Sequence, residues 1–151
     1  MNWWLTADRL YGSGQSLWDA EGFPFAASSM MLFGMCVECL LKGLALSNGR
    51  ALNEVIKRSH NLNGSAEDAG LKLSAQGTVL CDELKTFIEH FGRYPVGRGH
   101  HNMDAGQPRI TGLRLTEAAK QTLDKEVIAP IMAEVLKRMN SEGAFFTYLP
   151  S

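Results

Sequence analysis

The sequence predicts an all-α protein, an up-and-down helical bundle of four to five helices. The longest apolar run, residues 24–47, has hydrophobic side chains on nearly every helical face, as in a helix buried among other helices. Two later stretches repeat apolar residues at intervals of three and four, the spacing of one helix face. No stretch has the convincing alternation of apolar and polar residues that a half-buried strand requires.

Length and charge set the broad class of the protein. A chain of 151 residues is the size of one domain, so we expect residues 1–151 to form a single helical domain. The formal net charge of −1 gives no overall attraction to nucleic acid or anionic lipid, so any such contact has to be local. The first residues lack the pattern of a secretory signal, and the three cysteines cannot all pair. We therefore predict a cytoplasmic protein with free thiols.

The central helix is predicted over residues 24–47, with Pro24 suited to its first turn and Asn48-Gly49 to its end. Glu38 and Lys42 lie four residues apart in the order that favours a helical ion pair. Each would cost about 2.5–3.5 kcal/mol at the centre of a bilayer, so we predict a core helix and no membrane contact. Cys36 and Cys39 form a C-x-x-C in the middle of this helix, where packing thiols are favoured over a redox pair.

Further helices are predicted on both sides of the central one. Residues 3–20 form the first helix, in which Gly12-Ser13-Gly14 marks a point for a kink or a split. Its Trp3 and Trp4 suit a hydrophobic anchor or dimer contact better than a platform for stacked bases. Residues 51–58 hold a turn or two of helix. A short helix then ends near Gly70, with Asn61 or Ser65 as its N-cap.

The second half of the chain holds two longer helices. Residues 74–91 carry apolar side chains on one face, and residues 116–140 do the same. Pro130 lies inside the last helix and should kink it, because it cannot donate a backbone hydrogen bond. The aromatic tail after residue 142 is expected to fold back on the body or to contact a partner.

Residues 92–115 form a long irregular loop with five glycines and two prolines, and long loops in compact domains are usually functional or disordered. The loop concentrates basic side chains, with Asp104 opposing them. An arginine binds a phosphate through two donors, and a histidine moves a proton near neutral pH. The candidates for phosphodiester chemistry are Arg93 and His100 as catalytic residues, with Arg98, His101 and Arg109 as substrate-binding residues.

Two other interpretations of the same loop remain open. The loop is an ordinary solvated connection in one of them, with Arg93 pairing or capping a helix. In the other, His100, His101 and Asp104 hold a metal with His90 nearby, but no recognised zinc spacing is present. We therefore predict no metal and no cofactor.

Three pieces of the chain together resemble HEPN domains over residues 25–95. They are Glu38-Cys39-Leu40-Leu41-Lys42 in the central helix, His60-Asn61-Leu62 followed by Ala66-Glu67-Asp68-Ala69-Gly70-Leu71, and Arg93-Tyr94-Pro95. The resemblance implies a helical bundle that commonly dimerises and is associated with RNA or nucleotides. Many such domains accompany a minimal nucleotidyltransferase as a toxin–antitoxin pair, and others act in defence systems.

The resemblance also implies two functions, between which the sequence does not decide. Active HEPN domains are metal-independent endoribonucleases with an arginine and a histidine a few residues apart at the dimer face. Arg93 and His100 fit that arrangement, although the residues between them form a glycine- and proline-rich loop. The alternative is a non-catalytic homodimeric interaction module that docks a partner such as a nucleotidyltransferase.

Overall fold

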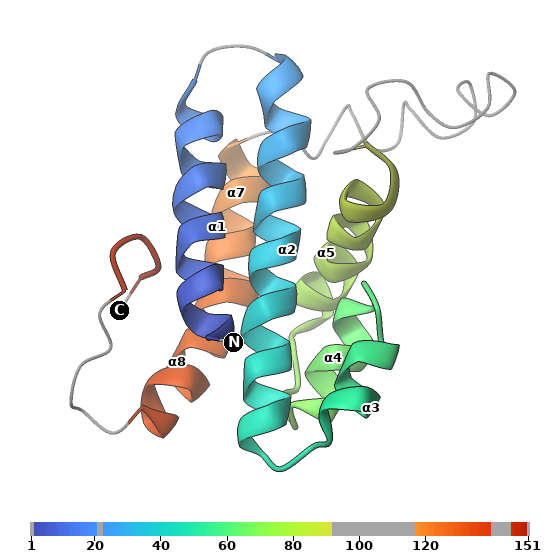
Figure 1. Cartoon of the computed structure of the whole chain (residues 1–151). Coiled ribbons are helices and arrows are strands. Elements are labelled where there is room, and N and C mark those ends of the chain that lie inside the picture. The colour runs from blue at the N-terminus through green and yellow to red at the C-terminus, as the bar shows by residue number, and fades with distance from the viewer. Residues whose placement is uncertain (1, 21–22, 92–116, 140–145, 151) are drawn as a thin grey trace, which may run out of the picture.

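The computed structural model describes residues 2–20, 23–91, 117–139 and 146–150, and the described part of the chain is helical with no strand. This confirms the all-α class (Figure 1). The elements in chain order are α1 (Trp3–Asp19), α2 (Phe23–Ser47), α3 (Leu52–Lys57), α4 (Leu62–Asp68), α5 (Ala75–Thr86) with its π-helical extension η1 (Phe87–Phe91), and α7 (Glu117–Leu123) continuing through the π-helical η2 (Asp124–Ile128) into α8 (Ala129–Arg138).

The described residues thus contain six helices when each π-helical segment is counted with its neighbours, more than the four to five predicted. The difference comes from α3 and α4, which have only six and seven residues. They lie beside the C-terminal half of α2, whereas the longer helices run along it (Figure 1). These two short helices cover the C-terminal end of α2, which α5 does not reach (Figure 1).

Helix α2 is the centre of the bundle, as its apolar sequence predicts. It contacts α1, α3, α4, α5, η1 and α8, and its fully buried side chains include Phe33, Val37, Leu40 and Leu41. By length and composition, residues Ala27–Ser47 would suffice to cross a membrane, but 67% of the most apolar window is buried inside the bundle. This burial fits the predicted role of a core helix.

Helix α1 runs unbroken through Gly12 and Gly14, so the split allowed by these glycines does not occur. Both glycines serve close packing. A Cβ atom at Gly14 would lie 2.8 Å from the ring of Phe33 on α2, and one at Gly12 would lie 2.4 Å from the ring of Tyr148 in the tail. The absence of side chains at these positions lets α2 and the tail approach the axis of α1.

The last helix is continuous but contains the π-helical segment η2 directly before Pro130. Proline has no N–H to donate to the carbonyl of Glu126 four residues earlier, and π-helical segments are one way a helix absorbs such a break. Helix α5 approaches the same carbonyl closely, because a Cβ at Gly77 would lie 2.7 Å from the oxygen of Glu126. The segment before Pro130 is thus π-helical, and α5 packs against it. The kink expected at Pro130 stays a prediction.

The described part of the tail, residues 146–150, folds back on the body, one of the two outcomes expected. The buried carboxylate of Asp8 accepts backbone hydrogen bonds from Thr147, Tyr148 and Leu149 at 3.1, 2.8 and 2.9 Å. Leu149 is itself buried in the core. The end of the chain is therefore fixed to its first helix.

Candidate functional site at the junction of α2 and α4

The residues predicted to carry the chemistry lie outside the described residues. Arg93, Arg98, His100, His101 and Arg109 all fall within 92–116. The described chain reaches this segment at the end of η1 and leaves it at the start of α7. Both of these ends lie at the end of the bundle where α2 begins (Figure 1).

Each side of this segment carries a π-helical turn. Segment η1 ends at Phe91, and η2 begins at Asp124, close to the start of α7. Such turns are rare and are frequent at functional sites, because they shift side chains out of the regular helical register. Segment η1 packs on α2, and η2 packs on α5 and α8.

Two motifs that are separate in the sequence meet on α2. The carboxylate of Glu38 accepts a hydrogen bond from Lys42 at 2.5 Å through one oxygen, and its second oxygen lies 2.8 Å from Nδ1 of His60. The ion pair predicted for Glu38 and Lys42 is thus confirmed. His60, the residue before the cap of α4, adds a contact that the spacing of the pair does not specify. Lys42 is 5% exposed, whereas the side chain of His60 is 29% exposed. The cluster therefore opens toward solvent on the histidine side.

The local structure around His60 is held by its neighbours. Ser59 adopts a left-handed backbone conformation, with φ of 49°, which turns the chain between α3 and α4. Asn61 is the N-cap of α4, and its side chain accepts a hydrogen bond from the N–H of Gly64 at 3.0 Å. Of the two caps considered from the sequence, the structure uses Asn61. His60 consequently occupies a fixed position immediately before a capped helix.

A bidentate ion pair closes the same turn. Nε and Nη2 of Arg58 donate to the two oxygens of Asp68 at 2.8 and 2.9 Å. The hydrogen bond from Arg58 lowers the pKa of Asp68 below its ordinary value. Because two of the three guanidinium nitrogens donate to the same carboxylate, the ends of α3 and α4 are held in a defined geometry.

A second polar cluster, which the sequence analysis missed, fastens the start of α7 to α1. The hydroxyl of Tyr11 donates to Asp124 at 2.8 Å and accepts from Lys120 at 3.1 Å. The buried ammonium of Lys120 also lies 5.0 Å from the ring centres of Tyr11 and Phe33. Burial, and then the hydrogen bond to Asp124, raise the pKa of Tyr11.

This second cluster is a structural anchor, because its polar groups form hydrogen bonds with one another. One turn earlier, the indole N–H of Trp18 donates to Glu117, the first residue of α7, at 3.1 Å. No local period could have revealed these pairs, since they join residues about 100 positions apart. The sequence offered only a weak indication of this cluster, namely that Tyr11 and Trp18 lie on a helix that also contains small residues.

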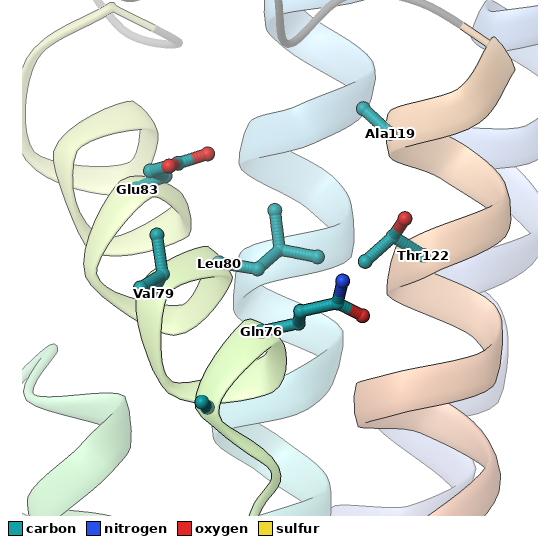
Figure 2. A pocket seen from close by; sticks show the side chains of 7 residues that line it. Gln76, Val79, Leu80, Glu83, Ala119 and Thr122 are labelled. Atoms are coloured by element: carbon teal, nitrogen blue, oxygen red, sulfur yellow. The ribbon is translucent and has the colours of Figure 1, made fainter.

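A shallow groove lies between α5 and α7. Its cavity volume is about 380 Å³, and it is lined by Ala75, Gln76, Val79, Leu80, Glu83, Ala119 and Thr122. Figure 2 shows Gln76 and Leu80 reaching from α5 toward Thr122 on α7. Val79 is 56% exposed at its edge. The groove is mostly apolar, which suits contact with a protein rather than catalysis.

The remaining candidates from the sequence have structural roles. The indole of Trp4 packs over Gly43 of α2, so it anchors α1. Burial raises the pKa of the three thiols, to about 11 for Cys39 and about 12 for Cys81, so they remain protonated at neutral pH. The described residues contain no group of three or more His, Cys, Asp or Glu side chains positioned to hold a metal ion.

Comparisons of this chain with protein-family models, with curated proteins and with solved structures found no match.

Proposed function

We propose that this chain is a HEPN-like, RNA-associated protein that cleaves RNA without a metal, as part of a toxin–antitoxin or defence system. The observation that carries the proposal is the contact of His60 with Glu38. It joins the two described pieces of sequence on which the resemblance rests, the central helix and the start of α4. The all-helical fold around α2 is also the fold class that the resemblance implies.

In this proposal the segment 92–116 supplies the groups that act on the phosphodiester. Arg93 holds the scissile phosphate, and His100 transfers a proton. Arg98, His101 and Arg109 bind neighbouring phosphates of the RNA. The protein acts in the cytoplasm as a homodimer, with the sites of two copies close together.

The test is cleavage of RNA by the purified protein in the presence of EDTA, followed on a gel. We expect cleavage by the natural chain and its loss in Arg93→Ala and in His100→Ala. Arg9→Ala is the matched control, because it removes an exposed arginine from α1 and should leave cleavage unchanged. Equal cleavage by all four proteins would identify a contaminant, and no cleavage by any of them would overturn the enzymatic proposal.

The groove between α5 and α7 favours a second candidate function, a non-catalytic homodimeric module that docks a minimal nucleotidyltransferase. The groove is apolar, and its edge residue Val79 is exposed. We expect Val79→Glu to weaken binding of such a purified partner by at least tenfold in calorimetry, whereas Thr86→Glu, on the same helix but outside the groove, should not. Equal affinity of the natural chain and Val79→Glu would exclude the groove as the docking surface.

A further inference from the structure

The pairing of Glu38 with His60 fixes which nitrogen of the imidazole is free. A carboxylate only accepts hydrogen bonds, so Nδ1 of His60, 2.8 Å from Glu38, carries the hydrogen in the neutral ring. Lys42 donates a hydrogen bond to the other oxygen of Glu38. In this arrangement Nε2 of His60 holds the lone pair.

That second nitrogen is accessible. The only buried polar side-chain atoms without a partner among the described residues are Nε1 of Trp4 and Oγ of Ser65, so Nε2 of His60 is not one of them. The side chain of His60 is 29% exposed, and its hydrogen bond among the described residues is the one through Nδ1. A carboxylate that orients an imidazole and leaves Nε2 open is the arrangement that makes histidine an effective general base.

We propose that His60, oriented by Glu38, is a further catalytic residue of this protein and acts as a general base on RNA. The inference rests on the proposed ribonuclease function and adds a proton acceptor to it. Because Lys42 neutralises the charge of Glu38, the pair is held in place without leaving an isolated carboxylate in the bundle. The substrate class is a single-stranded RNA with a free 2′-hydroxyl at the cleaved position.

The reaction step balances without an oxidant or a metal. Nε2 of His60 takes the proton of the ribose 2′-hydroxyl as the 2′-oxygen forms a bond to phosphorus. The bond from phosphorus to the 5′-oxygen breaks, and that oxygen takes the proton that the proposed function assigns to His100. The products are a 2′,3′-cyclic phosphate and a 5′-hydroxyl end, and the imidazolium returns its proton to water.

The test compares His60→Asn with the natural chain in the EDTA cleavage assay. The asparagine amide still donates to Glu38 but cannot accept and release a proton at the position of Nε2. We expect kcat to fall by about 10²-fold or more, the usual contribution of a general base, with unchanged RNA binding. Lys57→Asn, an exposed change on α3, is the control and should cleave normally.

Chemical rescue separates catalysis from a structural role. Added imidazole should restore cleavage in His60→Ala in proportion to its concentration, which it would not do for a merely misfolded protein. If both variants fail to fold by circular dichroism, the natural chain is treated with diethyl pyrocarbonate, and acylation of each histidine is followed by peptide mass spectrometry. Cleavage should be lost in step with acylation of His60 rather than with that of the other three histidines.

Each result decides the question. Normal cleavage by His60→Asn, or by natural protein acylated at His60, would overturn the role of His60 while leaving the proposed ribonuclease in place. No cleavage by the natural chain would overturn both. Loss in His60→Asn with rescue of His60→Ala by imidazole is the outcome expected.

Discussion

The carboxylate of Asp8 on α1 accepts a hydrogen bond at 2.9 Å from the backbone N–H of Leu149, 141 positions further along the chain. Asp8 is only 2% exposed, and the N–H groups of Thr147 and Tyr148 complete its coordination. A buried carboxylate requires such partners, because the loss of its hydration is otherwise uncompensated. The contact thus binds the first helix to the last described residues.

Replacing Asp8 by asparagine should lower the free energy of unfolding by about 1–3 kcal/mol, because one charged acceptor of the tail N–H groups is lost and a donor amide takes its place. Urea denaturation followed by circular dichroism measures this change. Asp19→Asn, at the exposed end of the same helix, is the matched control and should alter stability by less than about 0.5 kcal/mol. Equal stability of the two variants would contradict a stabilising role for the tail contact.

Replacing Gly77 by alanine should destabilise the protein by about 1–3 kcal/mol through overpacking, although the same change in an isolated helix is favourable. The cause is the carbonyl oxygen of Glu126, which lies 2.7 Å from the position of the new Cβ and belongs to a rigid backbone. Thermal unfolding of Gly77→Ala and of the exposed control Gln76→Ala measures the effect. A higher melting temperature for Gly77→Ala would show that α5 and η2 are not in close contact.

A double-mutant cycle on Glu38 and Lys42 should give a coupling free energy of about 1–3 kcal/mol. Glu38→Gln leaves the ammonium of Lys42 buried without an anionic partner, so the double variant with Lys42→Met should be more stable than Glu38→Gln alone. The exposed pair of Glu134 and Lys137 on α8 is the control, for which the coupling should be below about 1 kcal/mol. Similar coupling in the two pairs would mean that Lys42 is hydrated.

The buried thiols predict a loss of stability at alkaline pH. Burial raises the pKa of Cys81 from its ordinary value of 9.0 to about 12, so the unfolded chain releases this proton at lower pH than the folded one. The stabilisation is therefore complete below pH 9 and is lost as the pH rises from 9 toward 12, at about 1.4 kcal/mol per pH unit for each such group. Unfolding midpoints in urea at increasing pH measure this slope.

Cys81→Ala is the appropriate comparison for that measurement, because it removes one titrating thiol from the core. Its unfolding free energy should fall less steeply with pH than that of the natural chain. The raised pKa of Cys39, Cys36 and Tyr11 acts in the same direction, so the slope of the variant should be reduced rather than abolished. Parallel curves for the two proteins would show that Cys81 does not titrate differently on unfolding.

Sequence patterns were sufficient where the determinants are local. The apolar run predicts α2, and the spacing of Glu38 and Lys42 predicts their ion pair. The two candidate caps, Asn61 and Ser65, predict a short helix, which begins after Asn61. They failed where the determinants are distant. The network of Tyr11, Lys120 and Asp124 has no period in the sequence, because it depends on how two remote helices are placed.

The same distinction applies to the candidate site. The spacing of Glu38 and Lys42 predicted their ion pair, but no local pattern specified that His60 would contact it. The geometry of that contact could not be predicted either, because the tautomer of His60 follows from which ring nitrogen faces Glu38. The chemistry assigned to Arg93 and His100 stays a prediction.

The central position of α2 has a consequence for how the protein unfolds. Among the described residues, each of the other helices contacts α2 or continues a segment that does. Few of them can detach without exposing part of the apolar surface of α2. Such an arrangement favours cooperative unfolding, in which the amide protons of one central segment exchange with solvent only when the whole domain opens. In hydrogen exchange, the amides around Phe33 to Leu41 should thus report the global stability, whereas those of α3 should exchange first.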